Sequence, residues 1–189
     1  KKKNENYKKL KISVHIPLYV DLKKKKQLKN FRKACSSFLA LSNRTKIFVH
    51  SNKKFKGNKK IKYFYYDFNK IKEHPYKLTW FCRKIMENQK NKFDVFIYSE
   101  DKILLTKKNF RYWLDHKDLC IKNDYNLGFL RYEIKNKTFY SADQITKSKY
   151  YVNLLNKKYI VPQNTSCAFW IYDKKEFKSF IKTKYWKFD

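Results

Sequence analysis

Strand and helix patterns alternate along the first hundred residues, and this alternation restricts the fold more than any other feature. From Lys11 the sequence KISVHIPLYV places an apolar side chain at every second position, which is the pattern of a strand. Residues 28–43 carry apolar side chains at helical spacing, and short strand patterns begin at Lys46 and Lys60. The predicted order in this part is therefore strand, helix, strand, strand.

The alternation continues in the second half. HPYKLTWFCRKIMENQKN predicts a helix with Pro75 in its first turn, and the apolar run Val95–Tyr98 predicts a buried strand that ends in the acidic turn 99–101. NFRYWLDHKDLC predicts a helix capped by Asn109, and NLGFLRYEI predicts a further strand. In the last third we expect short strands or hairpin arms in TFYSADQ, KYYVNLL and KKYIVPQ, a buried strand in CAFWIYD and a terminal helix.

This order of elements favours a Rossmann-like three-layer α/β/α sandwich, whose ligands bind beyond the carboxyl ends of the strands. The 16 Phe, 16 Tyr and four Trp residues are enough for one large core, so we expect a single domain over 1–189 in which 1–10 is a flexible basic segment. With only two glycines the chain has neither a GxGxxG fingerprint nor a GxxxxGK[ST] loop, which excludes the common dinucleotide-binding and P-loop patterns.

The charge of the chain suggests an anionic partner. Its 47 Lys and Arg residues face 16 Asp and Glu residues, a formal net charge of +31. Such an excess is typical of proteins that bind nucleic acid or an anionic membrane. However, only five of the 47 are Arg, and Lys, Asn, Ile, Tyr and Phe are abundant together, as in a protein from an AT-rich genome. We attribute most of the lysine excess to codon bias and do not expect nucleic acid as the partner.

The cysteines and the longest apolar runs indicate in which cellular compartment the protein is expected. The four cysteines are widely spaced in apolar surroundings and form no zinc pattern with the four histidines, which predicts buried, reduced thiols in a cytoplasmic protein. No apolar run approaches the 18 or so residues that cross a bilayer, so no transmembrane segment is expected. Peripheral membrane association stays open, as does a longer parent chain.

The turn at the end of the predicted strand Val95–Tyr98 offers chemistry. Two carboxylates, Glu100 and Asp101, leave the strand together. They provide hard oxygen ligands for Mg²⁺ or Mn²⁺ when a substrate diphosphate supplies the remaining ligands, which outlines a nucleotide-sugar site. The alternative is a solvated turn that Lys102 neutralises locally.

Four segments in order, HPYKLTWFCRK, FDVFIYSEDKILLTKKNFRYWL, NLGFLRYE and NTSCAFWIYDKKEF, resemble a family of glycosyltransferases with the GT-A fold. The resemblance spans roughly residues 11–186. It implies that the acidic turn is the counterpart of the DxD motif, which holds a divalent metal on the diphosphate of a nucleotide sugar. This chain departs from that motif, because Ser99 replaces the first Asp and Lys102 follows where an acid is often found. Lys102 is therefore a candidate to neutralise phosphate charge itself.

The resemblance also implies roles for single residues. Asp101 would be the main metal ligand, and Glu100 a second ligand or an acceptor for a sugar hydroxyl. Arg83 would reach the diphosphate or orient the acids. Four residues at two strand ends would line the base and ribose pocket: Pro17, Tyr19, His50 and Ser51. The ordinary alternatives are a core position for Tyr19, a strand-end polar residue for His50 and a surface ion pair for Arg83.

Transfer of a sugar with inversion needs a carboxylate base to take the proton of the acceptor hydroxyl. Glu133 at the end of NLGFLRYE and Asp143 in the SADQ turn are the two candidates, with Asp143 ranked ahead. The expected function is transfer from a nucleotide-diphosphate sugar to a glycan or other hydroxyl acceptor. The alternatives are a non-enzymatic basic protein that binds nucleic acid or an anionic surface, and a degenerate transferase without turnover.

Overall fold

The computed structural model describes residues 6–21, 26–141, 150–161 and 168–187 of the 189-residue chain. The chain divides into two compact units. The first consists of Lys1–Phe110 together with Ala168–Asp189, and the second of Arg111–Cys167. They are called the sheet unit and the hairpin unit below.

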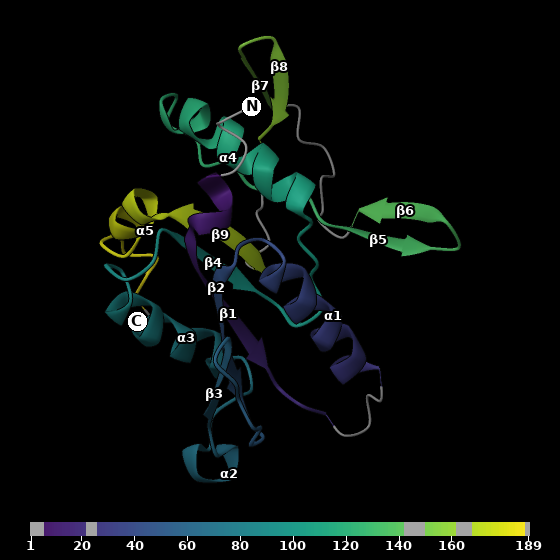
Figure 1. The fold of residues 1–189 in the computed structure, drawn as a ribbon, viewed down its shortest axis with the longest axis vertical. Coiled ribbons are helices and arrows are strands. Elements are labelled where there is room, and N and C mark those ends of the chain that lie inside the picture. The colour runs from purple at the N-terminus through teal and green to yellow at the C-terminus, as the bar shows by residue number, and fades with distance from the viewer. Residues whose placement is uncertain (1–5, 22–25, 142–149, 162–167, 188–189) are drawn as a thin grey trace. The chain divides into compact units, whose positions relative to one another are not determined.

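The sheet unit contains one five-stranded sheet with the strand order β3-β2-β1-β4-β9 (Figure 1). Strands β1 to β4 are mutually parallel where they pair, and β9 is antiparallel to β4. This mostly parallel sheet with helices confirms a mixed α/β fold. The strands and helices of the unit, after a 3₁₀ turn at Asn6–Lys9, are β1 (Lys11–Leu18), α1 (Gln27–Leu39), β2 (Arg44–Ser51), β3 (Ile61–Tyr65), α2 (Phe68–Ile71), α3 (Lys77–Asn88), β4 (Val95–Ser99), β9 (Phe169–Asp173) and α5 (Lys174–Phe180).

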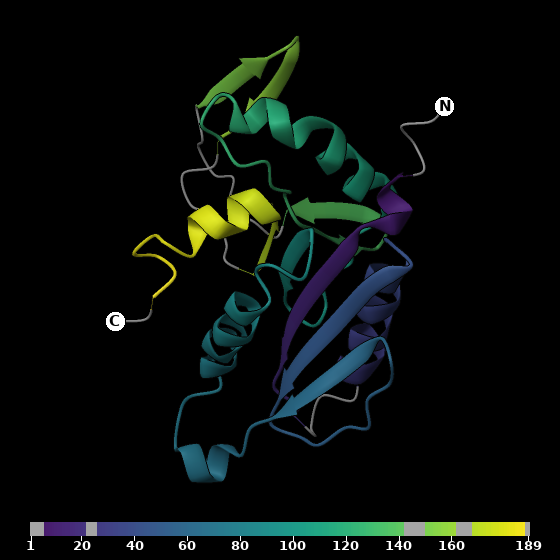
Figure 2. The ribbon, with the colours of Figure 1, turned by 60° about the vertical axis from the view of Figure 1, so that its left-hand side comes forward.

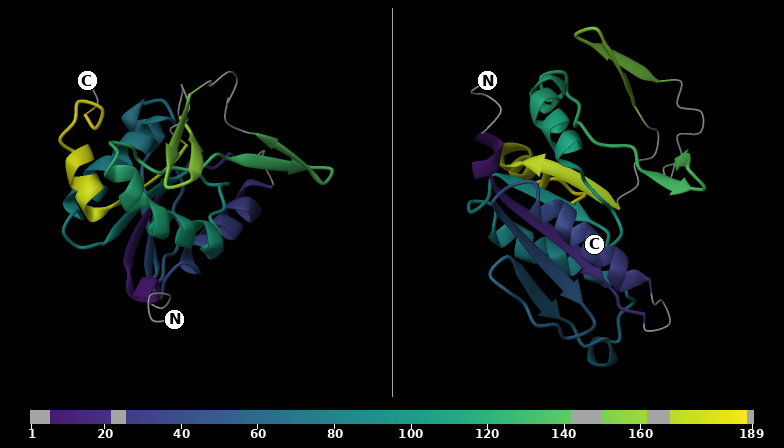
Figure 3. Two further views of the ribbon diagram at one scale, coloured as in Figure 1. Left: turned by 90° about the horizontal axis from the view of Figure 1, so that it is seen from above. Right: turned by 45° about the vertical axis from the view of Figure 1, so that its right-hand side comes forward.

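Helices cover both faces of the sheet, which explains why β4 is buried at every position. Figures 2 and 3 show α1 on one face and α3 on the other. Cys82 and Met86 of α3 share one aromatic core with Phe177 of α5, so these two helices cover the same face. Side chains on β1 alternate between the two faces of the sheet, as predicted from the sequence. Ile12 and the other even-numbered residues point to one face. Ser13 and His15 point to the other, where they lie beside Gln89 at the end of α3.

Most element predictions agree with the structure, and the differences lie at the ends. Helix α4 (Lys107–Ile121) begins before Asn109, the residue predicted to cap it. The hydroxyl of Thr106 accepts a hydrogen bond from the backbone N–H of Asn109 at 3.1 Å, so Thr106 satisfies an N–H of the first turn instead. Pro75 precedes α3 rather than lying in its first turn, because the helix begins at Lys77.

The hairpin unit contains two separate two-stranded antiparallel sheets. One pairs β5 (Tyr132–Lys135) with β6 (Thr138–Ser141), and the other pairs β7 (Tyr151–Leu154) with β8 (Lys157–Ile160). The strand predicted in NLGFLRYEI is therefore misplaced. Residues 126–131 belong to a loop and form no strand. Strand β5 begins at Tyr132 and pairs with β6 through a two-residue turn instead of joining the large sheet.

Candidate functional site

The carboxyl ends of the four parallel strands lie at one edge of the large sheet. The chain passes from β1 to β2 and β3 on one side of β1, and β4 lies on its other side. Ligands of open α/β sheets bind at such a change of direction, outside the carboxyl ends of the strands. Two segments meet this description: the loop Tyr19–Asp21 after β1 and the turn Glu100–Asp101 after β4.

The acidic turn follows β4 directly, as predicted. The Ser99 side chain is fully buried, and its hydroxyl donates to the carbonyl of Glu100 at 3.0 Å. The N–H of Glu100 donates to the carbonyl of Ala168 at 2.9 Å, which fixes the turn against the segment before β9. Glu100 and Asp101 are partly exposed and Lys102 is exposed. The two carboxylates are therefore accessible on a fixed turn, whereas the hydroxyl of Ser99 is buried and hydrogen-bonded within the turn.

Gln27, the first residue of α1, connects the two strand ends. Its side-chain N–H₂ group donates to the carboxylate of Asp101 and to the carbonyl of Tyr19, both at 2.8 Å. Its side-chain oxygen accepts from the N–H of Asp21 at 3.2 Å. The loop after β1 and the acidic turn are thus held together by one amide side chain. Gln27 was not predicted as a site residue, because nothing in the sequence distinguishes it from any other polar residue near a helix start.

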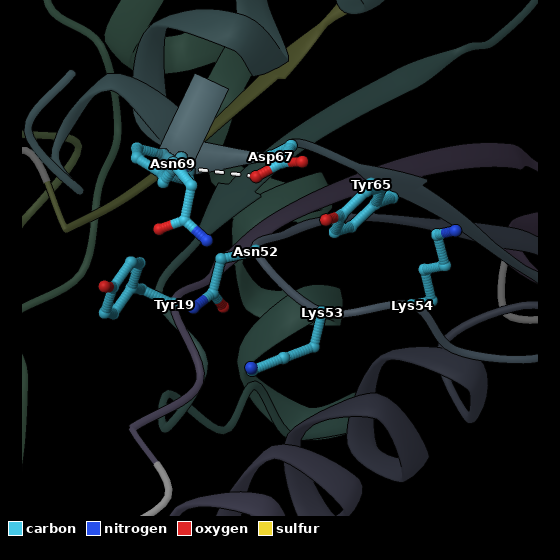
Figure 4. A pocket seen from close by; sticks show the side chains of 8 residues that line it. Tyr19, Asn52, Lys53, Lys54, Tyr65, Asp67 and Asn69 are labelled. Atoms are coloured by element: carbon cyan, nitrogen blue, oxygen red, sulfur yellow. Dashed lines mark hydrogen bonds between the residues drawn. The ribbon is translucent and has the colours of Figure 1, made fainter. Parts of the chain in front are cut away.

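A pocket of about 360 Å³ lies at the ends of β1, β2 and β3 (Figure 4). Eight residues line it: Tyr19, Asn52, Lys53, Lys54, Tyr65, Asp67, Phe68 and Asn69. Tyr65 is the last residue of β3, and the others come from the segments that follow the three strands. The volume falls within the range of about 300–1,000 Å³ that is usual for small-molecule sites.

The pocket combines aromatic rings with positive charge. Tyr19 and Tyr65 are 41% and 44% exposed, and Figure 4 shows their rings on opposite sides of the pocket. Lys54 holds its ammonium 5.2 Å from the centre of the Tyr65 ring, and Lys53 extends from the neighbouring position. The carboxylate of Asp67 accepts from the N–H of Asn69 at 3.2 Å and caps α2. Two lysines beside two exposed rings suit a planar, anionic ligand.

Another lining residue supports the loop after β1. The side-chain oxygen of Asn52 accepts from the N–H of Val20 at 2.7 Å, and its N–H₂ group donates to the Val20 carbonyl at 3.3 Å. Asn52, directly after β2, and Gln27 of α1 therefore both hold the loop after β1. The loop contributes Tyr19 to the pocket, and Gln27 links the loop to Asp101.

Not every residue expected at the nucleotide pocket lies there. Tyr19 lines it, whereas Pro17 lies within β1 opposite His50 and is not a lining residue. His50 and Ser51 are fully buried, which corrects the expectation that they face a ligand. They belong to β2 itself, and the accessible positions begin one residue later, at Asn52. The lining residues after β3 were missed, although the same strand-end rule applied to YYDFN would have found them.

Arg83 also has a different role from the one expected. Its guanidinium donates to the carbonyls of Tyr185 (2.7 Å) and Trp186, and stacks 3.8 Å from the centre of the Trp80 ring. These contacts fasten the C-terminal segment to α3. The prediction that Arg83 reaches a diphosphate or orients the acids is corrected accordingly, because the guanidinium is engaged by backbone carbonyls.

A buried chain of hydrogen bonds runs behind the strand ends. Nδ1 of His15 lies 3.0 Å from Nε2 of His50, and Nδ1 of His50 lies 3.0 Å from the Tyr66 hydroxyl. At the other end, Nε2 of His15 lies 3.1 Å from the side-chain oxygen of Gln89, which also accepts from the Ser13 hydroxyl at 2.8 Å. Both histidine side chains are completely buried.

The partners fix the direction of this chain. The Gln89 oxygen only accepts, so Nε2 of His15 carries its proton and Nδ1 accepts from Nε2–H of His50. Nδ1 of His50 then accepts from the Tyr66 hydroxyl. This arrangement requires both rings to be neutral. Burial supports it, since it lowers the pKa of His15 to about 3 and holds the pKa of His50 well below its usual range.

Cys82 of α3 stands beside the two histidines, and the ligand atoms of the three residues all lie within 4.8 Å of one another. Such a set would suit a softer metal than the predicted oxygen site. The contacts account for the cluster without an ion. Each histidine nitrogen has a hydrogen-bond partner, and the Cys82 thiol donates to the carbonyl of Leu78 at 3.1 Å. Burial raises the pKa of Cys82 well above its ordinary value, which disfavours the thiolate that a metal needs.

The two candidate bases were expected near the carboxyl ends of the sheet strands. Glu133 lies on the exposed strand β5 of the hairpin unit, so it does not end a strand of the large sheet as predicted. Asp143 lies outside the described residues. The three cysteines that the structure describes, Cys35, Cys82 and Cys120, are buried, as expected.

Within the described residues, none of the helices has the length and apolar character that crossing a bilayer requires. Comparisons with known proteins add no relative: no family model, curated protein or solved structure matches the chain.

Proposed function

We propose that the sheet unit binds a nucleotide-diphosphate sugar and that the protein is a glycosyltransferase with a GT-A-like fold. One observation carries this proposal. The acidic turn after β4 and the aromatic, lysine-bearing pocket after β1 to β3 occupy the same edge of the sheet, and Gln27 joins the loop between them. A nucleotide sugar needs both features side by side, because it carries a planar base at one end and a charged diphosphate next to the sugar.

In this proposal the nucleoside occupies the pocket. A base would stack between or against Tyr19 and Tyr65, whose rings are already exposed to solvent. Lys53 and Lys54 would offset part of the negative charge of the diphosphate.

The diphosphate and the sugar would lie toward the acidic turn. Glu100 and Asp101 fit a divalent cation such as Mn²⁺ or Mg²⁺, because two accessible carboxylates are the hard oxygen donors that these ions prefer. When bound, the cation would neutralise charge on the departing nucleoside diphosphate. Gln27 would orient Asp101 through its hydrogen bond to the carboxylate. Lys102, exposed beside the acids, is the residue that would supply positive charge in place of a metal.

The proposal also names a catalytic base. Inverting transfer needs a carboxylate near the acceptor hydroxyl, and general base catalysis typically contributes about 10²- to 10⁴-fold. Glu133 was considered because it was expected to end a strand of the large sheet, and that argument no longer holds. Asp143 therefore stays ahead. We expect Asp143→Asn, and not Glu133→Gln, to lower kcat by about 10²-fold or more with donor binding nearly unchanged.

The test is a screen of UDP-, GDP- and other nucleotide sugars by thermal shift, each with and without Mn²⁺. A ligand that binds the folded protein alone raises the melting temperature. The proposal expects stabilisation by one nucleotide class, followed by release of the nucleoside diphosphate when an acceptor is added. Binding without release in the presence of acceptors would indicate the degenerate transferase, and no stabilisation by any nucleotide would reject the proposal.

A further inference from the structure

The hairpin formed by β5 and β6 has one apolar face that the described structure leaves exposed. Tyr132 and Ile134 point to the same side of β5, and their partners across the ladder are Ser141 and Phe139. The side chains of Tyr132, Ile134 and Phe139 are 58%, 64% and 66% exposed. The ring of Tyr132 packs edge-on against Phe139 at 5.1 Å, so the three side chains form one continuous apolar face. We call them the hairpin apolar face.

An isolated two-stranded hairpin is marginal in water and gains stability when its apolar face is covered. The other face differs in character. It carries Glu133 opposite Tyr140 and Lys135 opposite Thr138. The hairpin is therefore amphipathic, and its apolar face is the side that a partner would cover.

Positive charge surrounds this face. Lys135 ends β5, and Lys137 is the second residue of the two-residue turn, in which Asn136 and Lys137 both have positive φ angles. Both lysines are exposed. Arg131 precedes β5, and Glu133 is the one acidic residue in 131–141. Long lysine side chains can keep their ammonium groups at a charged surface while neighbouring apolar groups insert below it.

We propose that this hairpin docks onto the surface of an anionic phospholipid bilayer. The hairpin apolar face would enter the boundary between headgroups and acyl chains, and Lys135 and Lys137 would contact the headgroup phosphates. Tyr and Phe side chains favour this boundary, and each lysine near an anionic surface adds to the attraction. This inference concerns the hairpin unit and does not depend on the proposed transferase activity.

Two other occupants fit less well. A second copy of the chain would bring two bodies of net charge +31 together, and like charge at that level keeps proteins apart. A single-stranded nucleic acid needs aromatic ring faces on which bases can stack. Here Tyr132 and Phe139 are packed edge-to-face against each other, and Ile134 has no ring. The apolar, partly aliphatic face therefore favours lipid.

Sedimentation of the full chain with sucrose-loaded vesicles tests the proposal. Vesicles of equal parts phosphatidylglycerol and phosphatidylcholine should pellet the protein, and pure phosphatidylcholine should pellet much less. Phe139→Ser should lower the partition coefficient about tenfold or more, because burying such a side chain contributes strongly to transfer. Tyr140→Ser is the matched control, since Tyr140 is 52% exposed on the opposite face of the same hairpin. It should change partitioning by less than about twofold.

Two double lysine variants distinguish an effect of the hairpin lysines from a general effect of the positive charge of the chain. Lys135→Gln with Lys137→Gln should lower partitioning roughly tenfold or more. Lys59→Gln with Lys60→Gln removes the same charge at exposed positions of the sheet unit and should have little effect. Circular dichroism checks that all variants remain folded. Equal losses in the two charge variants, equal losses in Phe139→Ser and Tyr140→Ser, or binding to a uridine oligonucleotide without binding to vesicles would overturn the proposal.

Discussion

The buried hydrogen-bond chain and the open edge of the sheet are built on the same strands, but they treat polar side chains in opposite ways. His15, His50 and Tyr66 find all their partners inside the protein, and burial keeps both histidines neutral. Four residues after His15 and three after His50, Tyr19 and Lys53 face a pocket. A polar residue near a strand end is therefore a ligand candidate only when it lies past the last buried position. The first group should control stability, and the second should control binding.

The largest expected effect comes from breaking the buried chain. His15→Ala removes a completely buried ring that stacks on Phe48 at 4.9 Å, and it leaves His50 without its acceptor. We expect a loss of about 3 kcal/mol in the free energy of unfolding, measured by urea titration. Tyr19→Ala, at an exposed position, should cost less than about 1 kcal/mol. Similar losses in both variants would contradict the division between a stability region and a binding region.

The same histidine predicts an acid-sensitive stability. The unfolded chain takes up a proton on His15 near pH 6.5, whereas the folded protein resists protonation until about pH 3. Stability should therefore be constant above about pH 6.5 and fall between pH 6.5 and 3, by up to about 1.4 kcal/mol per pH unit from this residue. Urea titrations of the wild type and His15→Ala at several pH values test this. The variant should lose less stability on acidification, and parallel curves would refute the assignment.

Arg83 was expected at the open edge of the sheet, but its guanidinium holds the C-terminal segment against α3. It should therefore affect stability and not binding. Arg83→Ala should lower the free energy of unfolding by about 2 kcal/mol, since it removes charged hydrogen bonds to the carbonyls of Tyr185 and Trp186. Nucleotide affinity, measured by calorimetry, should not change. A variant of normal stability with weakened nucleotide binding would return Arg83 to the donor site.

The smallest effect is expected within the pocket. Tyr65→Ala should weaken nucleotide binding about fivefold, as expected for the loss of one stacking contact of about 1 kcal/mol, and leave the melting temperature nearly unchanged. Tyr76→Ala is the matched control, because Tyr76 is 78% exposed and does not line the pocket. If both variants bind the nucleotide equally well, the base does not stack on Tyr65.

The sequence predicted the sheet well because its strands and helices are covered by other elements, and burial imposes a clear period on the side chains. Val95–Tyr98 and the alternation from Lys11 are examples. The hairpin unit has no such constraint, since β5 and β6 are exposed at every position. The acidic turn was predicted from its place after a buried strand. Gln27 was not, because its role depends on a hydrogen bond across 74 positions of the chain.

The role of the acidic turn in donor binding is tested by calorimetric titration of the nucleotide sugar found in the screen, with Mn²⁺, into the wild type and Asp101→Asn. The asparagine keeps an oxygen that can accept from Gln27 and removes only the charge of the carboxylate. We expect Mn²⁺-dependent binding to the wild type, binding to Asp101→Asn that is weaker by about tenfold or more, and equal stability of the two proteins. Equal affinity of the two proteins in the presence of Mn²⁺ would contradict the claim that the acidic turn after β4 holds the donor.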